Sequence, residues 1–509
     1  MRTKIILAML LIVSVLSVHA QDSTKVIELE KVTITGYSFK TVSKRSSALS
    51  VDIVEKEFLK EHFTGNLMQT LEYMPGVRSM DVGSGFSKPM IRGMGFNRIS
   101  VTENGIKQEG QQWGSDHGLE IDAFNVERVV IRKGPSSLLY GSDAMGGAIE
   151  ISQTPPPLDN QIFGDVILLD KTVNGTLSGS IGLGIKKGAW HSKVRYSEQH
   201  FGDYRIPTDT IVYLTQQMPV HNRKLKNTAG FERNGNLYTE YRKGRYLSNY
   251  AVSNAYQKVG FFPGSHGIPD ASRIQDDGDS RNIELPYSMV NHFKLTSRQQ
   301  YVWDKFAGSW DVGYQNNLRE EWSLFHTHYD TQVPPQNNSN KELEFDLNTY
   351  SSSLKLRTVN SSQWEYNGGW DVQYQQNYIG GYSFLLPEYN RFTTGLFGLV
   401  NWKRSQEFLL SGGMRYDYGY IDITQHKDHY LKEYLQSSGY DDNMIEQYEW
   451  RSYAVKRNFG DFSGSLGVVW NLTASAFQGR MSWLLTEFIM ALSDTSKVIP
   501  RWIRNEDGN

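Results

Sequence analysis

Residues 126–151 read VERVVIRKGPSSLLYGSDAMGGAIEI, and this stretch does most to decide the fold. The apolar run at 129–131 predicts a buried strand, which Gly134-Pro135 ends in a turn. Leu138 and Leu139 fit one short helical turn. A glycine-cornered loop follows, and the apolar residues at 148–151 predict a last strand. The stretch therefore predicts a compact unit of strand, turn, helical turn and strand.

Further segments of the same kind precede it. Leu67 and Leu71 lie on one face of a predicted helix, which must end near Tyr73 because Pro75 disfavours helix in the residue before it. A strand is predicted at 98–102, and the Asn104-Gly105 pair after it is a strong signal for a tight turn. These segments belong to one ordered α/β domain.

Together with Ile91-Arg92-Gly93, these segments form an ordered set over residues 26–152 that resembles the plug domain of TonB-dependent outer-membrane receptors. The resemblance implies a mainly β fold, with an N-terminal α/β plug domain inside an antiparallel transmembrane β-barrel of about 22 strands. The Bacteroidetes type of receptor is favoured. Polysaccharide importers of the SusC group are less favoured, because those generally carry a further β-domain before the plug.

The first residues predict export. Arg2 and Lys4 precede an apolar stretch at 5–18, and Val18-His19-Ala20 fits a signal-peptidase site. The stretch is too short to span a bilayer as a helix, which needs about 20 apolar residues. We expect a signal peptide at 1–20, with a retained N-terminal anchor as the alternative. The chain has no cysteine, which excludes disulfides, thiolate metal sites and a lipid-modified cysteine.

Charge and hydropathy narrow the possible partners. The chain has 53 basic and 55 acidic residues, which argues against nucleic acid as a partner. A mean hydropathy of −0.50 is typical of soluble proteins. It is equally compatible with a transmembrane β-barrel, whose strands alternate lipid-facing apolar residues with lumen-facing polar ones.

Alternation of this kind recurs between positions 157 and 470. Trp370, Val372 and Tyr374 alternate with Asp371, Gln373 and Gln375, and similar patterns occur at 190–196, 414–420 and 462–470. Aromatic residues on one face and charged or polar residues on the other fit a barrel with a wet lumen. A soluble β-sandwich or propeller would show similar strands, and the plug-like segments favour the barrel over it.

The predicted organisation is a signal peptide at 1–20, an energising segment and linker at 21–40, a plug at 41–156, a partial barrel at 157–470 and an atypical tail at 471–509. At about 22 to 25 residues for each strand with its connection, residues 158–470 hold only about 13 strands. The tail is apolar and helix-compatible at 483–492, and strand alternation is lost there. We expect a truncated or frame-shifted receptor that assembles poorly, because lipid does not tolerate unpaired strand edges.

Residues 30–35 read EKVTIT and resemble the TonB box, the segment that the energising TonB–ExbB–ExbD complex recruits as an added strand. The residues concerned are Glu30, Lys31, Val32, Thr33, Ile34 and Thr35. They can equally be the first strand of the plug, and the box can also lie a few residues earlier, around 26–29.

Five charged residues are candidates for contacts between plug and barrel: Arg92, Glu127, Arg128, Arg132 and Lys133. The family usually has arginine where this chain has Lys133. Lysine keeps the charge and loses the bidentate fork, so the resemblance implies weaker contacts there.

Ligand-binding candidates lie between residues 108 and 120, in a loop that by resemblance faces the ligand: Gln111, Gln112, Trp113, Asp116 and His117. Asp116 and His117 can supply oxygen and nitrogen to a divalent metal, as can His326 and His328. Solvated loop histidines are the simpler interpretation of all of them.

The favoured function is an outer-membrane receptor and transporter, not an enzyme. It would import a scarce ligand such as a siderophore–iron complex, a cobalamin-like molecule or a metal ion. The chain would contact outer-membrane lipid, the TonB–ExbB–ExbD complex and its ligand, with no cofactor beyond a transported metal or metal chelate. The alternatives are an exported β-rich enzyme or carbohydrate-binding protein, or a non-functional truncated receptor. No serine, histidine and acid set points to catalysis.

Overall fold

The computed structural model describes residues 50–110, 118–134, 136–213, 215–263, 271–275, 277–327, 332–359, 363–405, 407–474, 477–485 and 490–491. The chain separates into two compact units, Met1–Thr41 and Val42–Asn509, and every described residue belongs to the second. The predicted signal peptide and the candidate energising segment at 30–35 therefore lie outside the described residues.

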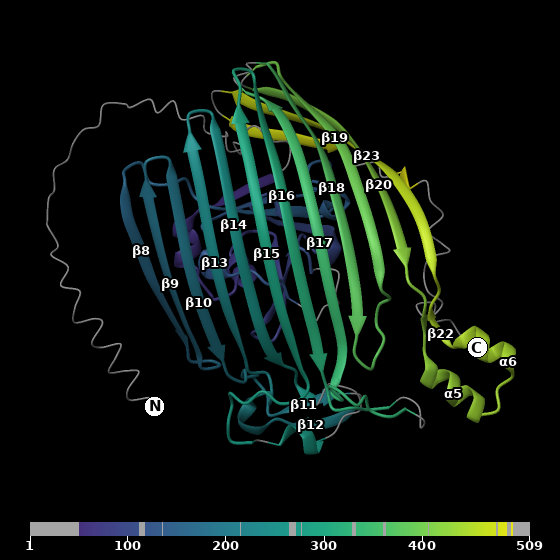
Figure 1. Ribbon diagram of the computed structural model, residues 1–509. Coiled ribbons are helices and arrows are strands. Elements are labelled where there is room, and N and C mark those ends of the chain that lie inside the picture. Colours follow the sequence, from purple (N-terminus) through teal and green to yellow (C-terminus); the bar gives the residue numbers. More distant parts are fainter. Residues whose placement is uncertain are drawn as a thin grey trace, which may run out of the picture. The chain divides into compact units, whose positions relative to one another are not determined.

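An N-terminal domain, residues 50–152, is built around a sheet in the order β1-β6-β7-β4-β5. In Figure 1 this domain is drawn in purple and blue behind the large sheet. Its elements are β1 (Ser50–Val54), α2 (Lys56–Glu61), α3 (Leu67–Leu71), β2 (Val77–Val82), β3 (Phe86–Ile91), η2 (Phe96–Arg98), β4 (Ile99–Glu103), β5 (Ile106–Lys107), η3 (Ala123–Asn125), β6 (Arg128–Lys133), α4 (Ser137–Tyr140), η4 (Ser142–Ala144) and β7 (Gly147–Ser152). The predicted strand, helical turn and strand are β6, α4 and β7.

One hydrophobic core holds this domain together. Leu67 and Leu71 of α3 pack with Val129 and Ile131 of β6 and Ile149 of β7, and all five are buried. The predicted helical face is thus the buried face. Asn66 caps α3 by accepting hydrogen bonds from the backbone N–H groups of residues 68 and 69.

Gly147 begins β7 at a position that tolerates no side chain. Its φ is +152°, and a Cβ there would lie 2.4 Å from the carbonyl oxygen of Arg132 on β6. Such a contact is far inside van der Waals distance, so the close approach of β6 and β7 requires glycine.

The large sheet is antiparallel and follows the chain order along one path, β8-β9-β10-β13-β14-β15-β16-β17-β18-β19-β20-β23-β24, with β25 off the path. Its strands are β8 (Gln161–Lys171), β9 (Thr176–Lys187), β10 (Trp190–Phe201), β13 (Gly230–Lys243), β14 (Tyr246–Gly260), β15 (Tyr287–Val302), β16 (Phe306–Trp322), β17 (Lys341–Thr358), β18 (Trp364–Gly380), β19 (Tyr389–Lys403), β20 (Phe408–Ile423), β23 (Val455–Ala474), β24 (Phe477–Leu485) and β25 (Met490–Ala491). The expected antiparallel barrel-type sheet with an N-terminal α/β domain is confirmed. Among the described strands β8 pairs only with β9, so the described sheet is open at β8.

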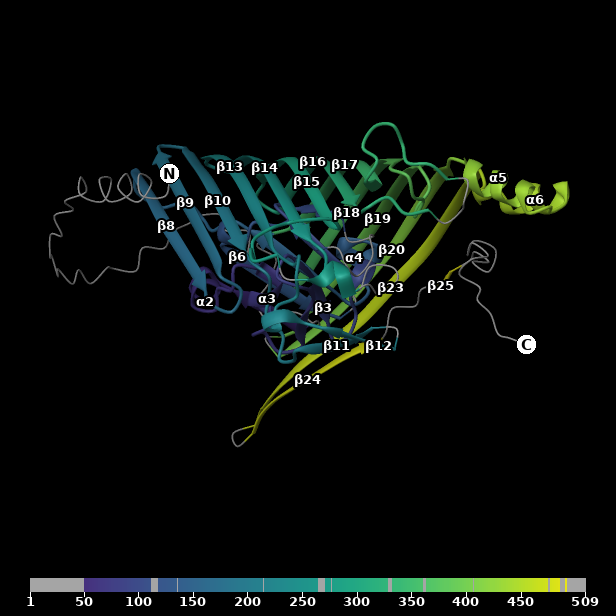
Figure 2. The same cartoon turned by 90° about the horizontal axis from the view of Figure 1, so that it is seen from below.

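Strand alternation gives the large sheet two chemically different faces. On β16, Gln315, Asn317 and Arg319 are buried on the face toward the N-terminal domain, whereas Trp310 and Val312 are exposed on the other face. Figure 2 shows the elements of the N-terminal domain on the concave side of the sheet. The inner face is therefore polar and the outer face apolar, as the sequence predicts.

The two rims of the large sheet differ. One, the short-turn rim, has connections such as 188–189, 244–245 and 303–305. The other, the long-loop rim, has connections such as 202–229 and 424–454. The long-loop rim holds β11 (Thr210–Tyr213), β12 (Gln216–Pro219), η5 (His221–Arg223), η7 (Ala271–Ile274), β21 (His426–Lys427), α5 (His429–Ser437), α6 (Asp442–Tyr448) and β22 (Trp450–Ser452). None of the described helices is long and apolar enough to cross a bilayer.

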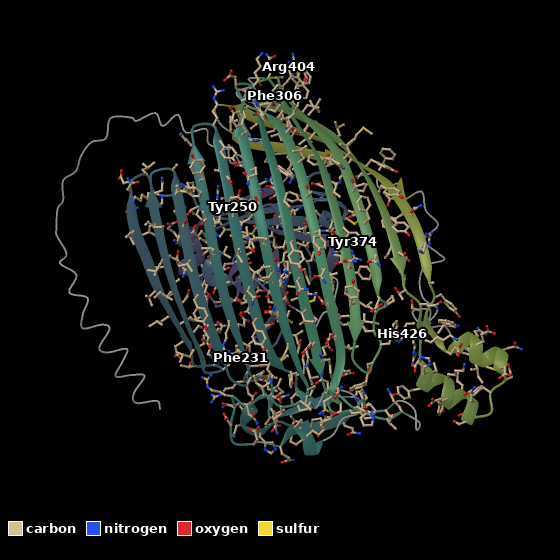
Figure 3. The ribbon with its side chains drawn as sticks, in the orientation of Figure 1. Phe231, Tyr250, Phe306, Tyr374, Arg404 and His426 are labelled. Carbon is tan, nitrogen blue, oxygen red and sulfur yellow. The ribbon has the colours of Figure 1, made fainter. Side chains whose placement is uncertain are left out.

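Aromatic side chains concentrate on the outer face near the short-turn rim. Trp190 contacts Tyr241 with ring centroids 4.8 Å apart, and Trp364 stacks on Trp402 at 5.8 Å. Phe306 lies at this same rim (Figure 3). A row of Trp and Tyr at one end of an apolar face is typical of a membrane interface.

The sheet extends past the predicted boundary at 470. β23 continues to Ala474, and β24 pairs with it in register from Ala474↔Phe477 to Leu466↔Leu485. The predicted helix-compatible stretch thus begins inside a strand at 483–485. In the sequence, Phe477, Gly479 and Met481 alternate with polar residues, a period of two that the local apolar run at 483–492 conceals.

Candidate functional site

An apolar contact joins the N-terminal domain to the large sheet near the long-loop rim. Phe86 of β3 packs with Phe201 of β10 and Val259 of β14, and Phe261 lies against them. The Phe86 and Phe261 rings are stacked with centroids 5.5 Å apart. Burying such a side chain stabilises by roughly 1.5–3 kcal/mol, so this cluster is a strong anchor for the β2–β3 hairpin.

The most buried charged contact between the two parts is Glu120 with Arg319 of β16. Arg319 Nη2 lies 2.7 Å from Glu120 Oε1, and the two side chains are 0% and 2% exposed. Asn317 Nδ2 donates to Glu120 Oε2 at 3.2 Å, and His292 Nδ1 lies 3.4 Å from the same oxygen. Burial alone would raise the pKa of the Glu120 carboxyl, but Arg319 and His292 outweigh it and lower that pKa. Glu120 is therefore held as a carboxylate.

A second charged contact lies beside the first. Lys294 of β15 is ion-paired with Glu103 and donates to Gln108 Oε1 at 2.7 Å. A polar cavity of about 10 Å³ is lined by Glu103, Glu120, Asp122 and Lys294 among other residues. Space of that size holds about one water molecule. This part of the interface is polar and closely packed.

The residues on both sides of the predicted ligand loop contact the large sheet. Before it, the backbone N–H of Glu109 donates to Gln315 at 3.3 Å, and Glu109 Oε1 accepts from Gln373 of β18 at 2.9 Å. After it, Glu120 binds β16 as described. The loop candidates themselves lie outside the described residues: Gln111, Gln112, Trp113, Asp116 and His117.

Glu127, one of the predicted contact residues, lies against the large sheet. Its Oε2 is 2.6 Å from Lys193 Nζ of β10 and accepts from the backbone N–H of Thr154 at 2.9 Å. Its Oε1 is 3.4 Å from Lys56 Nζ of α2. Glu127 thus connects the start of α2 with a strand of the large sheet.

The other predicted contact residues have their partners inside the N-terminal domain. Arg128 Nε lies 3.3 Å from Glu55, and Arg132 Nε donates to the Tyr140 hydroxyl at 2.9 Å. Lys133 Nζ is 2.5 Å from Asp52. For Arg92 the backbone N–H donates to the carbonyl of residue 76 at 2.9 Å, and its φ is +51°. Among the described residues, these four side chains have no ion pair with the large sheet.

Acid should weaken the Glu127 contact. Burial opposes the charge of Glu127, but Lys193 and the Thr154 donors lower its pKa from 4.5 to about 2. A lowered carboxyl pKa contributes stability that is present above pH 4.5 and is lost as the pH falls through about 2. After the cost of burying the Lys193 ammonium, we expect Glu127→Gln to lose about 2 kcal/mol at pH 7 and little below pH 2.

Urea unfolding of wild type and Glu127→Gln in detergent, followed by circular dichroism at pH 7, 4 and 2, measures this. The difference between the two midpoints should shrink as the pH falls. A constant difference across the range would mean that the side chain acts through its shape rather than its charge.

Two more contacts fix the domain. Asp122 Oδ2 accepts from Ser197 Oγ of β10 at 2.6 Å and Asn236 Nδ2 of β13 at 2.7 Å. Burial raises the pKa of Asp122, and these hydrogen bonds only partly offset it. On the opposite flank, buried Arg415 of β20 lies 2.8 Å from Asp371 and donates to the carbonyl of Leu138 in α4.

A larger cavity of about 510 Å³ lies between the N-terminal domain and β8–β10. Leu59, Phe63 and Phe124 line one side, and Phe163, Ile167 and Leu169 line the other. Arg195 and Asp165 add an ion pair of 2.6 Å at its wall. A cavity of this volume with a mostly apolar lining and a few polar groups suits a small molecule.

The histidine candidates lie apart from these contacts. His326 Nδ1 lies 3.2 Å from the Tyr382 hydroxyl, and His326 Nε2 is 3.9 Å from Glu342. His328, like Asp116 and His117, lies outside the described residues. Within the part of the chain that the structure describes, no group of three or more His, Cys, Asp or Glu residues is placed to hold a metal ion.

The sequence did not predict which strand residues contact the N-terminal domain. The main ones are Lys193, His292, Arg319 and Arg415. The available signal was an isolated charged residue at an inward position of an alternating strand. Any residue that faces the lumen gives the same signal. The plug residue that each strand residue contacts therefore cannot be predicted without the pairing register of the strands.

The chain is similar to several known proteins. Residues 43–148 match the family model "TonB-dependent Receptor Plug Domain". An iron-regulated outer membrane virulence protein of Vibrio cholerae serotype O1 is 27% identical over 230 residues, which are 41% of this chain and 35% of that protein. The vitamin B12 transporter of Vibrio vulnificus is 31% identical over 140 residues, 27% of this chain and 22% of that one.

The fold also has solved counterparts. The ferric yersiniabactin uptake receptor of Yersinia pestis superimposes with a TM-score of 0.56 at 15% identity, covering 84% of this chain and 64% of that one. The alignments thus cover about a third or less of the length of these two curated relatives and about two thirds of the solved receptor.

Proposed function

Because residues 43–148 are a TonB-dependent receptor plug domain and the chain has the fold of that outer-membrane receptor family, we propose that it binds a scarce metal complex or cobalamin-like ligand for uptake. The plug is the N-terminal domain, and the large sheet is the barrel wall. The protein lies in the outer membrane. The observation that carries the proposal is a plug held on the polar inner face of a sheet whose outer face is apolar.

The class of ligand follows from the named relatives. One is regulated by iron, one transports vitamin B12 and one takes up ferric yersiniabactin. Residues 111–117, with Gln111, Gln112, Trp113, Asp116 and His117, are proposed to face the ligand. Their support is that Glu109 and Glu120, on either side of this stretch, both contact the wall.

We propose metal contact only for a metal that is carried within the ligand. The residues concerned are Asp116, His117, His326 and His328. A resident cofactor is not part of the proposal.

The energising partner is proposed to be TonB with ExbB and ExbD. Residues 30–35 are proposed to pair with TonB as an added strand, because backbone hydrogen bonds give affinity with little demand on sequence. The signal peptide at 1–20 is proposed to direct export, with the plug beginning near residue 41 and the wall near residue 157.

Ligand binding by outer membranes tests the receptor function. The full chain is expressed with its own leader, and outer-membrane vesicles are incubated with radio-iron-labelled ferric yersiniabactin, a ferric hydroxamate, or radio-cobalt-labelled cyanocobalamin. We expect saturable binding of at least one probe, displaced by excess unlabelled probe. Vesicles with equal amounts of folded receptor and no saturable binding of any probe would contradict the proposal.

A deletion of residues 30–35 separates binding from uptake. The deleted protein should bind its probe as the wild type does, while cellular uptake falls to the level of a host that lacks TonB. Deletion of residues 36–40, in the linker between this segment and the plug, is the control and should retain uptake. Equal uptake by wild type and the 30–35 deletion would remove the assignment of this segment.

A further inference from the structure

The outer face of the large sheet carries two adjoining rows of unlike chemistry across β16–β19. Tyr314, Tyr350, Tyr374 and Phe392 face one another in register, one from each strand. Two residues nearer the long-loop rim, Asn316, Asn348, Gln376 and Asn390 do the same. We call these the aromatic row and the amide row.

Three rings of the aromatic row, those of Tyr314, Tyr350 and Tyr374, lie next to one another. Tyr314 and Tyr350 have ring centroids 5.1 Å apart, and Tyr350 and Tyr374 are stacked at 6.5 Å. Tyr350 is 48% exposed and Tyr374 37% exposed, both on the side away from the plug. Tyr374 lies well along β18, far from the short-turn rim where Phe306 and Arg404 lie (Figure 3). The aromatic row is therefore a second interfacial belt, on the long-loop side of the apolar band.

The amide row is joined to the aromatic row by hydrogen bonds. The Tyr314 hydroxyl donates to Asn348 Oδ1 at 2.9 Å, and the Tyr374 hydroxyl donates to Asn390 Oδ1 at 3.2 Å. Asn316 Nδ2 donates to Asn348 at 3.1 Å, and Gln376 Nε2 donates to Asn390 at 3.2 Å. These contacts set the orientation of the amides before anything binds to them.

The absence of Lys and Arg from the two rows indicates which kind of partner they can bind. Neither row contains Lys or Arg, and the nearest charged group is the carboxylate of Asp346, which accepts from Asn316 at 2.5 Å. Phosphate recognition favours Arg and Lys, so a phosphate-directed surface would be built differently. Amides both donate and accept hydrogen bonds, as sugar hydroxyls do, and aromatic faces offer an apolar platform for a sugar ring.

We propose that the two rows bind the saccharide headgroup of an outer-leaflet glycolipid, with the rings against the sugar and the amides on its hydroxyls. The position of the two rows supports a lipid headgroup as the ligand. The rows lie directly beside the lipid-facing apolar band, at the height where headgroups begin. The proposal rests on the outer-membrane location in the proposed function and is independent of the transported ligand, which belongs to the opposite face of the sheet.

Lipid retention by the full chain tests this. The protein is reconstituted in nanodiscs that contain phosphatidylglycerol with lipid A, and the lipids that remain bound are counted by native mass spectrometry. We expect preferential retention of lipid A, and equal retention of lipid A from which the phosphates have been removed. The variant Asn316→Ala, Asn348→Ala, Asn390→Ala should lower retention at least about fivefold, the equivalent of one lost hydrogen bond of ordinary strength.

The matched control is Ser352→Ala with Thr394→Ala, which removes hydroxyls from the same outer face within the apolar band and should leave retention unchanged. Circular dichroism of each variant shows whether the sheet is intact. If the triple variant fails to fold, Tyr350→Leu, which keeps an apolar side chain and loses the ring, is measured in its place and should lower retention.

Any of the following results would overturn the proposal: no preference for lipid A, a preference that vanishes with the phosphates, and equal retention by wild type and triple variant. Association of two protein copies through this face, with no lipid retained, would also overturn it. Cargo binding in vesicles is scored separately, so a receptor that binds no cargo probe and still retains lipid A leaves this proposal standing.

Discussion

Replacing Glu120 by alanine is expected to destabilise the protein by about 3–5 kcal/mol, because the change leaves the Arg319 guanidinium buried without its counter-charge. Arg319 is 0% exposed, and its Nε and Nη1 atoms already have no hydrogen-bond partner among the described residues. Glu120 is thus its one ion-pair partner there. The effect should appear as a lower urea midpoint and faster hydrogen exchange in residues 118–125.

The double variant Glu120→Ala, Arg319→Met separates the lost pair from the orphaned charge. We expect it to be more stable than Glu120→Ala alone, because methionine fills much of the same volume without a charge. Glu61→Ala, at an exposed position of α2, is the matched control and should change stability by less than about 0.5 kcal/mol. A double variant as unstable as the sum of the two single ones would mean that Glu120 and Arg319 are not coupled.

The second large effect is expected from Phe201→Ala, which should cost about 3–5 kcal/mol. Phe201 is 1% exposed and packs with Phe86 of the plug and Val259 of the wall. Truncation opens a cavity where the β2–β3 hairpin meets β10, so hydrogen exchange should accelerate in residues 77–91. Thermal unfolding in detergent, with that exchange experiment, measures both results.

Two further variants define the cause of the Phe201 effect. Phe201→Leu should cost much less than alanine, because most of the volume is kept. Phe306→Ala removes an equal ring from the exposed face at the short-turn rim, where no cavity forms, and should cost less than about 1 kcal/mol. Equal losses for Phe201→Ala and Phe306→Ala would show that packing between plug and wall is not what the ring provides.

Local chemistry made much of the fold predictable. Asn104-Gly105 predicted a tight turn, and both residues have positive φ, 50° and 86°, between β4 and β5. Trp370 and Tyr374 were predicted on one face of a strand with Gln375 on the other. Their exposed fractions are 54%, 37% and 1%. Turn residues and the two-residue alternation of a strand involve only neighbouring positions in the chain. A single sequence is therefore enough to detect them.

The contacts of the site were not accessible in the same way. Glu120 meets Arg319, which is 199 residues further along the chain, and Glu127 meets Lys193. Such pairs depend on the register of every intervening strand and on how the plug is rotated against the wall. The sequence offers several acidic residues on one part and several basic ones on the other, and nothing local distinguishes their pairing.

The extent of the sheet was harder to predict than its individual strands. The sequence predicted an atypical tail from 471, and the structure places β24 there in register with β23. A short apolar run fits a helix and a buried strand equally well, and pairing with an existing strand decides between them.

The position of β1 at the edge of the plug sheet determines how a mechanical load travels. Tension applied on the N-terminal side of Ser50 reaches β6 through the five residue pairs from Ser50↔Lys133 to Val54↔Val129. Wall contacts lie on both sides of β6 in the chain: Arg415 holds the carbonyl of Leu138, five residues after Lys133, and Lys193 holds Glu127, two residues before Val129. The Glu120–Arg319 bridge lies seven residues before Glu127. We therefore expect traction to load the contacts at the two ends of β6 before it loads the Glu120–Arg319 bridge.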